Sequence, residues 1–327
     1  MESEPDIVET LIRRAGRRVE PPEDAYRQVL AAATDAFRDK TARRRQRRQV
    51  AWAAVAATVF MATVLLFQWA PPTADRDELA RVVRVIGGAE TAVGDDWLPL
   101  DEGYGSMGAG VRVRTQAGGR AALALSGGGS LRLAAETEVR LDAPGRLYVS
   151  RGTVYFDSGA TAGAGRLEFV TPAGTARDIG TQFELFVADA TLRVRVREGS
   201  VSIDRGGQTL TGVAGEQIAI GSLGTVERTS VAPDAEVWQW VESVTPTPDM
   251  DGRPASELIA WAARETGREL RYASPLVEQR AKQVILHGNI RNLAPLDALE
   301  AMLATTDLEY TLDGPTMEIR ARQPGTP

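Results

Sequence analysis

A run of twenty residues without a charged side chain, residues 50–69, divides the chain into two unequal parts. A helix of this length is about 30 Å long, which matches the hydrocarbon core of a bilayer. The pattern predicts a transmembrane helix. A helix buried in a soluble core is the alternative, but the segments that follow have the pattern of strands and offer such a helix no helical neighbours.

A basic cluster stands directly before this run and predicts the orientation of the chain. Positive charge near a span stays on the cytoplasmic side, so the N-terminus is predicted to be cytoplasmic. A cleaved signal peptide is disfavoured because 49 residues precede the run and a proline-rich segment follows it. The topology determinants are Arg43, Arg44, Arg45, Arg47 and Arg48.

Residues 1–49 have the pattern of two short amphipathic helices separated by prolines. Helices this short gain little stability unless an apolar face is packed against something, so this segment either binds a partner or is a solvated tail. The apolar stripe of the second predicted helix, and the candidate partner-binding face, consists of Tyr26, Val29, Leu30, Ala33 and Phe37.

Beyond a linker at residues 70–81, residues 82–230 alternate apolar and polar positions in short segments. Twenty-six of the 32 glycines fall between residues 82 and 224, mostly between these segments. Period-two alternation with closely spaced turns predicts an all-β domain, either a sandwich or roll or a solenoid-like fold. Residues 126–130, Ser-Gly-Gly-Gly-Ser, are predicted to form a hairpin loop.

The pattern changes again near residue 231. Residues 231–250 predict a short helix followed by a proline-rich linker, and residues 251–322 predict a small α+β domain with a tail at 323–327. Within this domain we expect helices at 256–265 and 295–305, strands at 269–272 and 284–286, and a hairpin over 308–320. The complete chain is thus predicted to be a multi-domain membrane protein.

Composition excludes several kinds of chemistry. The chain has no cysteine and a single histidine, His287, so neither a thiolate metal site nor a histidine-based catalytic triad is available. Residues 70–327 carry 26 basic and 35 acidic side chains, which argues against direct binding of nucleic acid. We predict no cofactor, no metal and no turnover enzyme.

Three segments of the β-rich region carry a family resemblance. They are Val-Thr-Pro-Ala-Gly at 170–174, Asp-Ile-Gly-Thr-Gln-Phe at 178–183, and the alternating valines around Gly199. Together they resemble the periplasmic domain of FecR-type anti-sigma factors. The matching positions are Val170, Thr171, Pro172, Gly174, Asp178, Gly180, Thr181, Phe183, Val194, Val196, Gly199 and Val201.

The C-terminal unit in turn is similar to the short N-terminal domain shared by secretins and TonB-dependent transducers, through residues 284–288, 295–303 and 308–319. The two resemblances imply a single-pass protein of the bacterial inner membrane with a periplasmic C-terminus. They further imply control of an extracytoplasmic-function sigma factor by residues 1–49 and contact with the signalling domain of an outer-membrane TonB-dependent transducer, commonly in iron uptake. Small residues in the span also suit an intramembrane protease.

Two alternatives stay open beside this reading. The chain could instead be an anchored FecR-domain scaffold that binds envelope protein or polysaccharide without controlling a sigma factor. The resemblance also implies a candidate self-cleavage, in which the hydroxyl of Thr181 attacks the carbonyl of Gly180 and the resulting ester is hydrolysed. In the simpler interpretation Gly180 forms a bulge and Thr181 is an ordinary strand residue.

Overall fold

The structure, a computed structural model, describes Arg14 and residues 78–159 and 167–322. The candidate partner-binding face at residues 26–37, the basic cluster and the predicted span all lie outside these residues. Within the part that is described, no helix combines the length and apolar character needed to cross a membrane.

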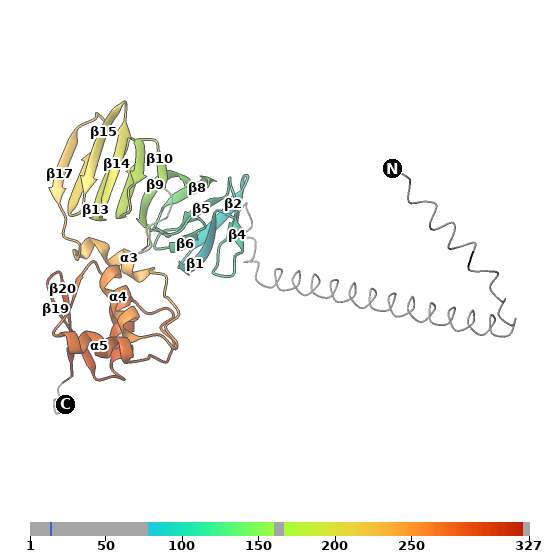
Figure 1. Cartoon of the computed structure of the whole chain (residues 1–327). Coiled ribbons are helices and arrows are strands. Elements are labelled where there is room, and N and C mark those ends of the chain that lie inside the picture. Colours follow the sequence, from blue (N-terminus) through green and yellow to red (C-terminus); the bar gives the residue numbers. More distant parts are fainter. Residues whose placement is uncertain (1–13, 15–77, 160–166, 323–327) are drawn as a thin grey trace, which may run out of the picture. The chain divides into compact units, whose positions relative to one another are not determined.

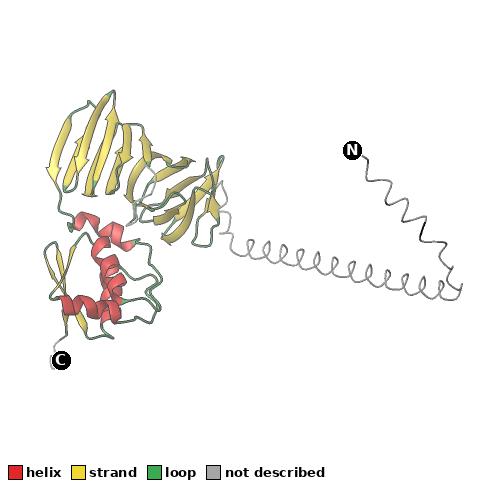
Figure 2. Cartoon of the chain, in the orientation of Figure 1, coloured by secondary structure: helices red, strands yellow, loops and turns green. Residues whose placement is uncertain are grey.

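In the described residues, 17 strands build an all-β domain from two layers, as the alternating pattern predicts (Figure 2). Neighbouring strands of the first layer are all antiparallel. Their spatial order is β4 (Ser106–Met107), β1 (Ala80–Ile86), β6 (Arg120–Leu125), β7 (Ser130–Leu133), β9 (Arg146–Asp157), β12 (Gln182–Ala188), β13 (Thr191–Glu198), β16 (Glu216–Ile220) and β17 (Val226–Ser230).

The second layer contains the remaining strands and is antiparallel except where β9 and β10 run side by side in the same direction. Its spatial order is β3 (Asp96–Pro99), β2 (Ala89–Val93), β5 (Arg112–Thr115), β8 (Glu138–Ala143), β9, β10 (Glu168–Thr171), β11 (Gly174–Asp178), β14 (Ser200–Arg205) and β15 (Gln208–Val213).

Strand β9 belongs to both layers and joins them (Figure 1). Its first half pairs with β8 and β10, with Tyr148 opposite Arg140, whereas its second half pairs with β7 and β12, with Phe156 opposite Leu131. The two sheet faces that β9 connects enclose one apolar core. Three phenylalanines at its centre, Phe156, Phe169 and Phe183, meet edge to face with ring centroids 5.1 to 6.1 Å apart.

The C-terminal unit follows a short helical stretch, η1 (Glu236–Trp238) and α3 (Gln239–Ser243). A three-stranded sheet in the order β18-β20-β19 packs with three helices around a second apolar core. The elements are α4 (Ala255–Glu265), β18 (Glu269–Tyr272), α5 (Pro275–Gln283), α6 (Pro295–Leu303), β19 (Leu308–Asp313) and β20 (Thr316–Ala321).

The helices predicted at 256–265 and 295–305 and the hairpin over 308–320 are present, and so is the hairpin loop at 126–130. The strand predicted at 284–286 is wrong, because only Ile285 bridges there, to Pro254. Helix α5 has no counterpart among the predictions. It buries only Val277 and Ala281, so its apolar stripe is too narrow to stand out in the sequence.

Candidate functional site

The turn between β11 and β12 contains the bond between Gly180 and Thr181. Gly180 is exposed, has a φ of +71°, and has no atom within 4 Å of the place where a Cβ would lie. Thr181, by contrast, is only 1% exposed, and its carbonyl oxygen accepts a hydrogen bond from the backbone N–H of Ser158 at 3.1 Å. An accessible glycine in the left-handed region is therefore followed directly by a buried threonine.

A second glycine lies against this turn. Gly199, between β13 and β14, has a φ of +75°, and a Cβ at this position would come within 2.3 Å of the Gly180 carbonyl oxygen and 2.8 Å of Thr181 Cγ2. Only a residue without a Cβ fits such a contact with backbone. Two segments of the family resemblance, around Gly180 and around Gly199, thus pack directly on each other.

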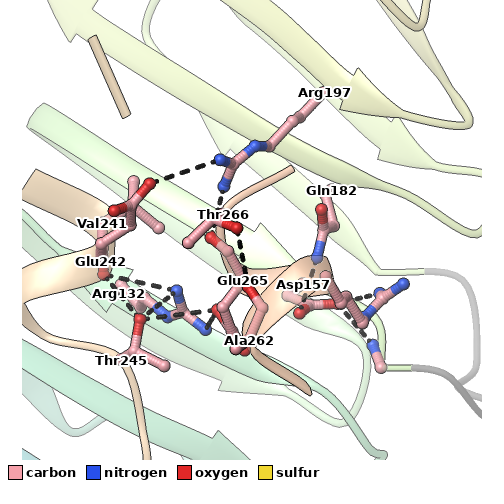
Figure 3. A network of polar contacts seen from close by, with 12 residues as sticks. Arg132, Asp157, Gln182, Arg197, Val241, Glu242, Thr245, Ala262, Glu265 and Thr266 are labelled. Atoms are coloured by element: carbon pink, nitrogen blue, oxygen red, sulfur yellow. Dashed lines mark hydrogen bonds and ion pairs between the residues drawn. The ribbon is translucent and has the colours of Figure 1, made fainter. Parts of the chain in front are cut away.

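A series of polar contacts connects the turn to helix α4 of the C-terminal unit, and Figure 3 shows its first contact, between Gln182 and Asp157. Gln182 Nε2 donates to Asp157 Oδ2 at 3.0 Å, and Asp157 Oδ1 lies 2.5 Å from Arg264 Nη2. Arg264 Nη1 in turn lies 2.8 Å from Glu198 Oε2. Glu198 lies opposite Gln182 in the backbone register of β12 and β13.

The next residue of α4, Glu265, forms a buried ion pair with Arg132 of β7. The closest nitrogen and oxygen are 2.8 Å apart, and the side chains are 8% and 1% exposed. Arg132 also donates to the hydroxyl of Thr245 at 3.1 Å, and its guanidinium lies 5.3 Å from the ring centroid of Tyr155. Burial alone lowers the pKa of Arg132, but Glu265, aided by Tyr155 and Asp157, outweighs it and leaves that pKa raised.

Arg197 of β13 makes a third set of contacts across the same junction. Its Nε donates to the Pro233 carbonyl at 2.6 Å and its Nη1 to the Glu265 carbonyl at 2.9 Å. Its guanidinium lies 5.3 Å from the ring centroid of the buried Trp238, and its Nη2 is 3.6 Å from Glu242 Oε1. Burial raises the pKa of Glu242, although Arg197 opposes that shift.

Arg84 of β1 extends this junction toward α6. It donates to the carbonyl oxygens of Thr245 and Asn292, both at 3.1 Å. Several arginines on the face of the first layer that points away from the apolar core therefore hold the C-terminal unit by its carboxylates and carbonyl oxygens. These contacts of Arg84, Arg132 and Arg197, together with those that Arg264 of α4 makes to carboxylates of the β domain, are called the interdomain junction below.

The β domain contains the family signature that the sequence suggests. Residues 111–202, from the start of β5 into β14, match the family model described as FecR protein. The chain carries a FecR domain. The matched stretch of the FecR domain includes the Gly180–Thr181 turn, Gly199, and the two carboxylates that hold Arg264.

Two crystal structures of a candidate anti-sigma factor from Parabacteroides distasonis are similar to the chain at 17% and 18% identity. Each match covers 65% of this chain and 99% of that chain, with a TM-score of 0.35. No curated protein matches the chain.

The structure places the sequence-predicted residues unevenly. Gly180 and Thr181 lie next to each other at the turn, and Gly199 joins them, while the candidate partner-binding face and the basic cluster lie outside the described residues. His287 lies on the exposed surface, 3.3 Å from Asp251, and no group of three or more histidine, aspartate or glutamate side chains suited to a metal occurs in the described ranges.

The interdomain junction was not predicted. Arg132 and Asp157 stand in strands at positions that alternate with the apolar core, which normally indicates side chains in solvent. The one local signal was Trp238 and Trp240, two aromatic residues in a short helix. Trp238 is completely buried, and Trp240 donates to Glu184 Oε2 of β12 at 3.0 Å. Both side chains therefore indicate that the helical stretch η1–α3 covers the first layer.

Self-cleavage between Gly180 and Thr181 can be tested directly. Since the Thr181 side chain is 1% exposed and the Gly180 carbonyl lies against Gly199, water has poor access to an ester formed there. We therefore expect purified wild-type protein and Thr181→Ala to give the same single full-length band on a denaturing gel. Two wild-type fragments that Thr181→Ala abolishes would contradict this expectation.

Proposed function

We propose that the chain is a FecR-type regulator of an extracytoplasmic-function sigma factor. The observation that carries the proposal is the FecR domain at residues 111–202, which follows a basic cluster and an uncharged stretch long enough to span a membrane. In this proposal residues 1–49 hold the sigma factor in the cytoplasm, and the FecR domain and the C-terminal unit lie in the periplasm, anchored to the inner membrane by one helix.

The proposed signal enters through the C-terminal unit. In this proposal the signalling domain of an outer-membrane TonB-dependent transducer binds the C-terminal unit. The interdomain junction would transmit the resulting change to the β domain, because ion pairs and hydrogen bonds connect α4 to β7, β9 and β13. A single helix transmits a rigid-body change poorly, so cutting by an intramembrane protease is the proposed final step. This route supports the proposal because each contact joins elements of different domains.

The experiment is capture of an extracytoplasmic-function sigma factor from cells of the source organism by the tagged full-length protein. We expect wild type to retain the sigma factor and Leu30→Asp to lose at least about tenfold in affinity, because a charge is placed in the apolar stripe of the second predicted helix. Gln28→Asp is the matched control. It adds the same charge on the opposite side of that helix and should leave capture unchanged.

Two outcomes would contradict the proposal. The first is that wild type retains no sigma factor and that deletion of this gene leaves transcription of the sigma-dependent genes unchanged. The second is that Leu30→Asp and Gln28→Asp retain the sigma factor equally well. The first outcome would leave the anchored scaffold, which binds envelope protein or polysaccharide, as the better description.

A further inference from the structure

Arg264 connects the C-terminal unit to the two strand ends that flank the Gly180–Thr181 turn. It lies in the last turn of α4, and its guanidinium contacts Asp157, the last residue of β9, and Glu198, the last residue of β13. The Arg264 side chain is 24% exposed and that of Asp157 is 7% exposed. The Asp157 contact is therefore a largely dehydrated ion pair, which is stronger and more directional than one in solvent.

Asp157 passes the contact on to the turn itself. One carboxylate oxygen faces Arg264 and also accepts from the backbone N–H of Gly159 at 2.8 Å, while the other accepts from the amide of Gln182. Gln182 follows Thr181 directly in the chain. In addition, the residue after Asp157, Ser158, donates its backbone N–H to the Thr181 carbonyl. The position of Asp157 thus determines where the groups that bind Thr181 and Gln182, on the C-terminal side of the turn, are placed.

Glu198 supports the other side. It precedes Gly199, on which the Gly180 carbonyl oxygen packs, so the end of β13 forms the base of the turn. Arg264 holds the ends of β9 and β13 on either side of β12 at once. No other positive charge described here touches Asp157, since its remaining partners are neutral N–H donors.

Helix α4 carries Arg264 to this place, and the neighbouring residue secures the helix. Glu265 is held by the buried Arg132 and its backbone carbonyl by Arg197. A displacement of α4 would withdraw Arg264 together with Glu265. It would leave Asp157 as a poorly hydrated carboxylate without a positive charge in contact with it, which is unfavourable, so the strand end would have to open to water.

We propose that Arg264 acts as a latch, through which the docked C-terminal unit holds the turn at residues 179–181 closed and whose withdrawal releases that turn. The device is independent of the sigma factor and of whether the chain is cut at Gly180–Thr181. Through this latch, docking of the C-terminal unit would control the conformation of the Gly180–Thr181 turn in the FecR domain.

Hydrogen exchange of the full-length protein, read by mass spectrometry, tests the latch. In Arg264→Gln, amides in peptides that cover residues 178–184 should exchange about tenfold faster than in wild type, the effect of losing one charge-assisted hydrogen bond. Peptides from the β14–β15 hairpin should be unchanged. Arg253→Gln is the matched control, because Arg253 also belongs to the C-terminal unit but pairs only with the exposed Glu257.

A second variant distinguishes loss of the latch from a general loss of stability. Glu198→Gln keeps α4 and its ion pair with Arg132 intact but weakens the grip of Arg264 on β13, and it should also accelerate exchange at residues 178–184. Unchanged exchange at the turn in both variants would overturn the proposal. So would an equal acceleration over the whole molecule, because a latch acts locally; neither result would alter capture of the sigma factor by residues 1–49.

Discussion

Glu265→Leu is expected to lower the free energy of unfolding by about 3–5 kcal/mol, the cost of breaking a buried ion pair by removing one partner. In the variant the guanidinium of Arg132, which is 1% exposed, keeps its contacts with the Thr245 hydroxyl, the Val241 carbonyl and the Tyr155 ring but loses the carboxylate that pairs with it. Denaturant unfolding of the full-length protein, followed by tryptophan fluorescence, measures this loss of stability, because the buried Trp238 lies at the interdomain junction.

Two comparisons separate the buried charge from other causes. The double variant Arg132→Met, Glu265→Leu removes both charges and should recover most of the loss, because apolar side chains of similar size can replace a buried ion pair. The control Glu269→Leu breaks the exposed pair with Arg271, whose side chains are 62% and 64% exposed, and should cost less than about 1 kcal/mol. Equal losses for Glu265→Leu and Glu269→Leu would show that the pair with Arg132 is not buried.

Gly199→Ala is expected to lower the free energy of unfolding by about 2–4 kcal/mol. The left-handed backbone at this position accounts for about 1 kcal/mol of this loss, and overpacking accounts for the remainder. The new methyl group would meet the Gly180 carbonyl oxygen at 2.3 Å, and a backbone atom cannot move aside as a flexible side chain can. A lowered midpoint in the same unfolding experiment is the expected result, with faster exchange at the Gly180–Thr181 turn.

The matched control is Gly118→Ala. Gly118 has the same φ of +75° but no atom within 4 Å of the position of a Cβ, so only the conformational cost of about 1 kcal/mol remains. If the two alanine variants lose equal stability, Gly199 does not pack on Gly180 as described.

The sequence predicts those parts of the fold in which short-range periodicity and burial agree. Leu131 and Leu133 alternate with polar residues and line the core, and the glycine-rich loop before them turns the chain into β7. The family resemblance singled out Gly180 and Thr181, but not the turn in which they lie; the simpler interpretation placed Thr181 in a strand, whereas β12 begins at Gln182.

The interdomain junction could not be predicted in this way, because it depends on contacts between distant residues. Arg132 and Glu265 are 133 positions apart, and nothing near either residue indicates its partner. Alternation correctly places Arg132 on the face away from the apolar core. Alternation also predicts that the Arg132 side chain is exposed to solvent, which is wrong. The helical stretch η1–α3 and helix α4 cover that face, so the charge of Arg132 is buried.

The sharing of β9 between the two layers has a consequence for cooperativity. The strands before β9 and the strands after it each use β9 as a neighbour in both layers, so unfolding of either half would leave β9 without a partner on one side in both layers. The FecR domain should accordingly unfold in one cooperative step. A displacement of Asp157, the last residue of β9, would therefore act on the strand that pairs with both halves of the domain.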